Sequence, residues 1–182
     1  MHVRELSRLL DVARSFAPGH RIVIFGSASL LPKYPHLGEP GQPLSPSLDA
    51  DFVIYGIADE LALALIDAVG ARSTFSKIAG FHADILRPDI TELFPPGWEE
   101  RLEPMTGFDG VFFLESADLA VAKLHAGRPK DIEILAHLLR EELLDAAVVR
   151  SRLDATPLRE KDIVKLHVNW RKVLAAAGMQ AE

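Results

Sequence analysis

The sequence LDADFVIY, residues 48–55, alternates between two kinds of side chain. Because successive side chains of a β-strand point to opposite faces, the pattern predicts a strand with one apolar and one acidic face. The apolar face would carry Leu48, Ala50, Phe52 and Ile54, and the other face Asp49, Asp51 and Val53. Two carboxylates about 7 Å apart on one face favour a cation between them. Hard oxygen ligands suit Mg²⁺ or Mn²⁺, although a solvated acidic face is the simpler alternative.

The segment before this strand ends in a pair of residues suited to phosphate binding. Residues 21–25 (RIVIF) are apolar and β-branched, which predicts a buried strand, and Gly26-Ser27 follows at once. A glycine lets the backbone approach a phosphate, and a helical turn after it offers free N–H donors. An ordinary turn is the alternative. Combined with a carboxylate pair on the next strand, the pattern favours a triphosphate and metal site.

A third carboxylate lies on a later alternating run, FHADIL at residues 81–86. His82 and Asp84 share one face of that predicted strand. If the strand neighbours the first one, Asp84 completes a carboxylate triad, where it could ligate a second metal or take the proton from an acceptor hydroxyl. The alternatives are a surface aspartate and a structural His82.

The rest of the chain predicts an α/β (α+β) fold, with a mixed sheet, flanking helices and a C-terminal helical part. An amphipathic helix opens the chain and ends at Pro18-Gly19, and residues 32–47 form a long Pro-rich loop. Ser116 is expected to cap a helix that runs to Gly127. The predicted domains are a core of residues 1–127 and a helical part of residues 128–182. The other expected elements are a helix at 58–69, one or two strands within 74–86, a strand at 111–114, a helix opening at Pro129 and a last helix from Thr156-Pro157 to Ala177.

Composition narrows the kinds of site and partner. The absence of cysteine excludes disulfides, thiolate metal sites and a cysteine nucleophile, so any metal must bind oxygen or imidazole. The first residues are amphipathic and charged, which indicates a cytoplasmic protein with no membrane partner. A net charge of −6 disfavours strong non-specific binding to nucleic acid.

Three separated motifs, FGSAS at 25–29, LDADFVI at 48–54 and KLHAGRPKDIE at 123–133, resemble the nucleotidyltransferase superfamily. The most similar members are bacterial nucleotidyltransferases of unassigned role and abortive-infection type IV toxins. The resemblance covers residues 22–139. One departure is the long stretch between Ser27 and Asp49, because family members usually connect these motifs more briefly.

This resemblance implies a role for each matching residue. Gly26 and Ser27 would hold the triphosphate, Asp49 and Asp51 the metals, and Asp84 would be the third carboxylate. Lys123 would reach the nucleotide phosphates. Arg128 would clamp phosphate or acceptor, and Asp131 would orient Lys123 or Arg128.

The favoured function is therefore a metal-dependent enzyme that moves a nucleoside monophosphate from a triphosphate such as ATP to an acceptor, which could be an RNA such as tRNA, a protein or a small molecule. A non-catalytic nucleotide- or partner-binding module of the same fold, paired with an antitoxin protein, is the main alternative. A hydrolase acting through Ser27 is disfavoured because no G-x-S-x-G motif surrounds it.

Overall fold

The computed structural model describes residues 1–180, without the side chains of residues 91–93. Contacts within the chain define two compact units. The first consists of residues 1–90 and 102–114, and the second of residues 91–101 and 115 to the end of the described chain. The sequence suggested a division after residue 127. By its contacts, however, helix α4 (Ser116–Ala126) groups with the later helices.

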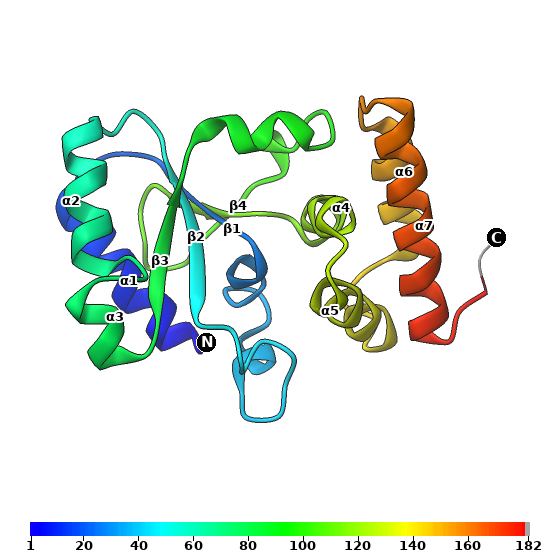
Figure 1. The fold of residues 1–182 in the computed structure, drawn as a ribbon, viewed down its shortest axis with the longest axis horizontal. Helices are drawn as coiled ribbons and strands as arrows, with labels where there is room; N and C mark the ends of the chain where they lie inside the picture. The colour runs from blue at the N-terminus through cyan, green and yellow to red at the C-terminus, as the bar shows by residue number, and fades with distance from the viewer. Residues whose placement is uncertain (181–182) are drawn as a thin grey trace. The chain divides into compact units, whose positions relative to one another are not determined.

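The first unit is built on a five-stranded mixed sheet with the order β3-β2-β1-β5-β4 (Figure 1). The central strand β1 (Ile22–Phe25) runs antiparallel to β2 (Asp49–Ile54) and parallel to β5 (Val111–Phe113). Strand β3 (His82–Leu86) pairs with β2 in parallel, and β4 (Glu103–Pro104) pairs with β5 in antiparallel fashion. This arrangement confirms the predicted fold class.

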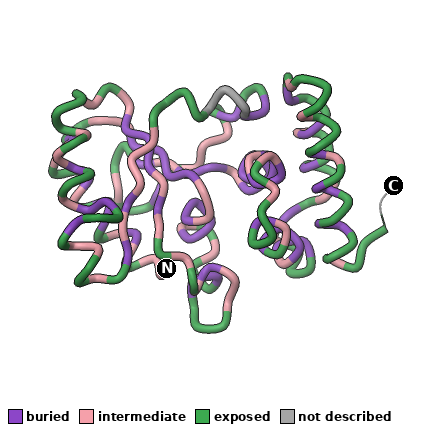
Figure 2. The backbone as a smooth tube through the Cα atoms, viewed as in Figure 1, coloured by how far each residue is buried: buried purple, intermediate pink, exposed green. Residues whose placement is uncertain are grey.

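The first four residues of β2 alternate in burial as predicted, but Val53 on the acidic face is also buried, and Leu48 lies before the strand and is 55% exposed. Ala50 and Phe52 are fully buried, and β1 is buried along its whole length (Figure 2). Helices α1 (Val3–Phe16), α2 (Asp59–Val69) and α3 (Thr74–Ala79) lie on the apolar side of the sheet (Figure 1). The short 3-10 helix η1 (Ser27–Leu30) contacts β1 and β2. The acidic face of β2 is therefore turned away from α1–α3.

The Pro-rich stretch 32–47 is an ordered loop with its own small core. It contains the 3-10 helix η2 (Pro35–Gly38), and Leu37 and Leu44 are buried. The amide of Leu44 donates a hydrogen bond to the carbonyl of Leu37 at 3.0 Å. The ammonium of Met1 donates to the carbonyls of Leu44 and Ser47, at 2.7 and 2.6 Å. These contacts fix the chain where it enters β2.

The prediction of one or two strands over residues 74–86 is wrong for residues 74–79, because they form helix α3. The side chain of Ser73 accepts a hydrogen bond from the amide of Ser76 at 3.0 Å and caps the helix N-terminus. Gly80, in a left-handed conformation, ends the helix. The caps outweigh the β-propensity of Thr74, Phe75 and Ile78.

Three other boundaries differ from the sequence predictions. The helix expected to be capped by Ser116 has Glu115 as its N-cap instead. Strand β4 is not among the predicted elements, since a two-residue strand leaves no periodic pattern. Thr156 follows helix α6 (Ala146–Ala155) rather than opening the last helix, α7 (Glu160–Ala177).

The second unit is a helical assembly. Helix α7 packs against α4 and against α5 (Pro129–Arg140), and α6 packs against α4. The segment between strands β3 and β4 holds the 3-10 helices η3 (Pro88–Leu93) and η4 (Glu99–Arg101). Within residues 1–180, no helix has both the length and the apolar composition required to span a membrane.

A buried carboxylate ties the segment 91–101 to these helices. Asp118 on α4 is fully buried, and Arg101 donates to its two oxygens through Nε and Nη2 at 2.8 Å each. Arg152 on α6 places its Nε 3.4 Å from Oδ1 of Asp118. One carboxylate thus balances two guanidinium groups from separate parts of the second unit.

We expect Asp118→Ala to lower the free energy of unfolding by about 3–5 kcal/mol, because two partly buried guanidinium groups lose their counterion. Urea unfolding measures this loss. Asp154→Ala is the matched control, since the Arg150–Asp154 pair at 3.0 Å is half-exposed and should contribute at most about 1 kcal/mol. Equal losses in the two variants would contradict the role of Asp118 as the shared counterion of Arg101 and Arg152.

Candidate functional site

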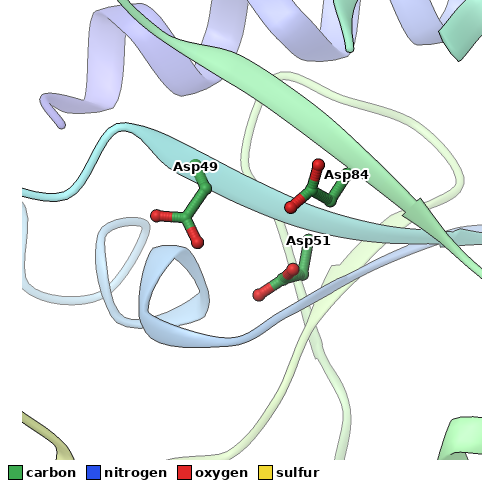
Figure 3. A group of neighbouring side chains, drawn as sticks. All are labelled: Asp49, Asp51 and Asp84. Carbon is green, nitrogen blue, oxygen red and sulfur yellow. The ribbon is translucent and has the colours of Figure 1, made fainter. Parts of the chain in front are cut away.

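Three carboxylates meet on the acidic face of β2 and β3 (Figure 3). The parallel register places Asp51 opposite Asp84 and Asp49 opposite His82, so these side chains share one face. Asp49, Asp51 and Asp84 each bring one carboxylate oxygen within 4.8 Å of the others. The alternation of residues 48–55 and 81–86 predicted the face on which each carboxylate lies, and the pairing of β2 with β3 meets the condition under which Asp84 joins Asp49 and Asp51. The binding of metal by the three residues stays a prediction.

Gly26 borders the carboxylates. Its φ of 60° and ψ of −161° are values that side-chain-bearing residues rarely adopt. A Cβ atom at this position would overlap Oδ2 of Asp51. The turn is held by Ser29, whose hydroxyl donates to the carbonyl of Gly26 at 2.8 Å. Ser27 begins η1, next to Gly26. The structure thus places Gly26 against Asp51, with Ser27 next to it in the chain, while the binding of a triphosphate by these two residues stays a prediction.

Two further side chains contact the carboxylates. The hydroxyl of Ser47 donates to Oδ1 of Asp49 at 3.0 Å. His82 Nε2 lies 3.7 Å from Oδ1 of Asp84. Sequence reasoning did not find Ser29 or Ser47, because isolated serines carry no periodic signal. It noted the shared face of His82 and Asp84 but assigned His82 no part in the site.

The donor set fits a hard divalent cation. All three carboxylates are partly exposed, so they combine solvent access with close mutual repulsion. A cation between them removes that repulsion. Carboxylate oxygens are the ligands that Mg²⁺ and Mn²⁺ prefer, and the exposed side leaves room for water or phosphate oxygens.

Lys123, Arg128 and Asp131 form a separate cluster within the second unit. Asp131 is fully buried and accepts hydrogen bonds from Lys123 Nζ at 3.1 Å and from Arg128 Nε at 2.7 Å. Lys123 is 4% exposed, whereas the side chain of Arg128 is more than half exposed. Nearby, Asn169 donates to the carbonyl of Leu124 at 2.9 Å, which ties the end of α4 to α7.

Burial acts on both charges of this cluster. Desolvation lowers the pKa of Lys123 despite the opposing attraction of Asp131. Desolvation also disfavours the ionised form of Asp131, but hydrogen bonds from Arg128 and Lys123 outweigh it, so the pKa of Asp131 lies below its usual value. Asp131 is therefore ionised at neutral pH and positions both cations. The predicted contact of Lys123 and Arg128 with a nucleotide stays a prediction.

Comparison with known proteins gives the family. Residues 4–177 match the model of a family described as nucleotidyltransferase of unknown function (DUF6036), so the chain belongs to that family. No curated protein and no solved structure matches the chain significantly.

We expect Gly26→Ala to abolish Mn²⁺ binding, because the added Cβ displaces the Asp51 carboxylate. Backbone strain should also lower the free energy of unfolding by about 1–3 kcal/mol. Calorimetric titration with Mn²⁺ and urea unfolding measure the two effects. Gly41→Ala is the control, because Gly41 also has a positive φ but has no atom near its would-be Cβ. Unchanged Mn²⁺ affinity in Gly26→Ala would contradict the close packing against Asp51.

Asp131→Asn should lower the free energy of unfolding at neutral pH by about 3–5 kcal/mol, because it leaves Lys123 buried without a carboxylate. The native pKa of Asp131 lies below its unfolded value, so the unfolded state binds more protons in acid. The difference from wild type should therefore shrink as the pH falls below about 4. Urea unfolding over a pH series tests this, with the exposed Glu133→Gln as control. If the difference in free energy of unfolding between wild type and Asp131→Asn grew in acid, the lowered pKa of Asp131 would be contradicted.

Proposed function

We propose that this protein is a metal-dependent nucleotidyltransferase that transfers a nucleoside monophosphate from a nucleoside triphosphate to an acceptor hydroxyl. The proposal rests on one observation above all: Asp49, Asp51 and Asp84 gather beside a glycine that leaves no space for a side chain. Membership of a nucleotidyltransferase family supports the same reaction.

Each residue near the cluster takes one part of the reaction. Asp49 and Asp51 would hold Mg²⁺ or Mn²⁺, and the backbone of Gly26 with the hydroxyl of Ser27 would hold the triphosphate. A cation held by these carboxylates would neutralise negative charge on the α-phosphate and on the departing pyrophosphate. Asp84 completes the metal site or accepts the proton of the acceptor hydroxyl.

The bond changes follow from this placement. The acceptor oxygen forms a bond to the α-phosphorus, and the bond from that phosphorus to the pyrophosphate oxygen breaks. The acceptor proton passes to Asp84, and pyrophosphate leaves. Ser47 and His82, through their contacts with Asp49 and Asp84, keep the two carboxylates in position.

The proposal also includes the roles that the resemblance implies for Lys123, Arg128 and Asp131 in the second unit. The hydrogen bonds of Asp131 to Lys123 and Arg128 support an orienting role for Asp131. Contact of Lys123 and Arg128 with the phosphates, the preference for ATP and an antitoxin partner stay predictions. A non-catalytic binding module would bind triphosphate without transferring it.

The direct test is triphosphate binding with and without metal. Wild type should bind a non-hydrolysable nucleoside triphosphate with Mn²⁺ or Mg²⁺ and lose it when a chelator is added. Asp49→Asn and Asp51→Asn should each weaken this binding by at least about 100-fold, since they remove metal ligands rather than their supporting groups. Their thermal stability should not fall, because each change removes like-charge repulsion.

Asp11→Asn, an exposed carboxylate on α1, is the matched control and should bind as wild type does. Release of pyrophosphate and transfer of α-phosphate label then separate the enzyme from a binding module. Equal triphosphate affinity in the presence and absence of chelator would exclude the proposed site.

A further inference from the structure

A pocket lies within the second unit, between the start of α6 and the second half of α7. Its volume is about 1020 Å³, at the upper end of the range for small-molecule sites. Its described walls are residues between 145 and 150 at the start of α6, residues between 167 and 174 of α7, and residues 179–180 after that helix. We call it the α6–α7 pocket. None of the residues proposed above for nucleotidyl transfer is among these walls.

The walls carry more positive than negative charge. Arg150, Arg171 and His167 line the pocket, against one carboxylate, Asp145. That carboxylate already has partners, because Asp145 caps α6 and its Oδ1 accepts hydrogen bonds from two backbone amides of the first turn, at 2.8 and 3.3 Å. An anion that enters the pocket is therefore attracted by two guanidinium groups and opposed by one carboxylate that backbone N–H groups stabilise.

Both guanidinium groups have donors to spare. Arg171 is exposed and forms no ion pair or hydrogen bond with the described residues. Arg150 donates through Nε to Asp154 at 3.0 Å, while its Nη groups bond no acceptor in the described part of the chain. His167 Nε2 lies 4.0 Å from Asp154, beyond hydrogen-bonding distance. Because a guanidinium group presents its donors as a planar fork, the two arginines suit carboxylate or phosphate oxygens.

The remaining walls are mostly apolar. They include Trp170, Leu174 and Met179. Trp170 is only 4% exposed, yet within residues 1–180 its indole N–H donates no hydrogen bond. A buried indole N–H ordinarily has an acceptor. An oxygen atom of a bound molecule would supply that acceptor, while the three apolar side chains would contact the body of the same molecule.

We propose that the α6–α7 pocket binds a small organic anion with an apolar body. The carboxylate or phosphate of this ligand bonds Arg171 and the Nη groups of Arg150, and its body packs against Trp170 and Leu174. A bare inorganic ion would leave most of the volume and all of the apolar surface unused, so the ligand is an organic molecule. The inference goes beyond the proposed function and does not depend on it.

The indole N–H signals of the full chain in a proton–nitrogen NMR spectrum test the site. The chain has two tryptophans, and Trp98 is not among the pocket walls, so its signal is an internal control. Trp98→Phe assigns the two signals. Four probes of one shape and different charge are titrated without metal or triphosphate: 1-naphthoate, 1-naphthyl phosphate, neutral 1-naphthamide and cationic 1-naphthylmethylammonium.

We expect at least one anionic probe to shift the Trp170 signal with a dissociation constant of about 1 mM or tighter, the scale for a ligand of this size. The Trp98 signal should not move. Arg171→Gln should weaken binding by about 5–10-fold, because an exposed charge-assisted hydrogen bond is lost. Lys165→Gln is the matched control and should bind as wild type does, since Lys165 is exposed on α7 outside the pocket walls.

A second pair of variants tests the volume. Ala147 is exposed and lines the pocket, so Ala147→Phe should abolish binding, whereas Ala175→Phe, at an exposed alanine of α7 outside the walls, should not. If Ala147→Phe does not fold, Arg171→Gln decides alone.

The outcomes are distinct for each probe. Binding of one anionic probe only supports the site and identifies the ligand as a carboxylate or as a phosphate. The site is overturned if the neutral or cationic probe binds as tightly as the anions, if Arg171→Gln binds as wild type does, or if no probe shifts the Trp170 signal. Because the titrations contain neither metal nor triphosphate, each of these results leaves the proposed nucleotidyl transfer standing.

Discussion

Like-charge crowding of Asp49, Asp51 and Asp84 is the constraint on which the candidate site depends. The three oxygens stay within 4.8 Å because two strands pair in one register, with Asp51 opposite Asp84. A shift of one residue would turn the carboxylates toward the apolar side and expose Ala50 and Phe52. Burial of those two side chains therefore holds the carboxylates together against their repulsion. A cation bound between the three carboxylates would relieve the repulsion that remains.

In the second unit, the charged groups that matter most are buried carboxylates paired with cations. Its two fully buried carboxylates, Asp118 and Asp131, are each paired with two cations. Such pairs add little net stability compared with apolar packing, but losing one partner is costly. They therefore fix which segments meet, since Asp118 joins η4, α4 and α6, and Asp131 joins the ends of α4 and α5. The KLHAGRPKDIE motif therefore joins α4 to α5, whether or not its residues also contact a nucleotide.

Local patterns predicted those parts of the structure that local physics determines. The alternation of residues 48–55 gave β2 and the shared face of Asp49 and Asp51, and Pro129 marked the start of α5. Helix α3 was missed because its caps act against the β-propensity of its residues. The hydrogen bonds of Ser29 and Ser47 join residues only three and two positions apart, but each depends on the conformation of a single turn, which leaves no periodic pattern in the sequence.

The long connection between Ser27 and Asp49 is the feature in which the sequence departs from the family pattern that it resembles. A disordered insertion there would loosen the entry to β2 and with it Asp49. The structure shows the opposite, because Leu37 and Leu44 are buried and Ser47, at the end of the loop, bonds Asp49 directly. The loop therefore supports Asp49, the first residue of the proposed metal site. Its length is then no argument against catalysis.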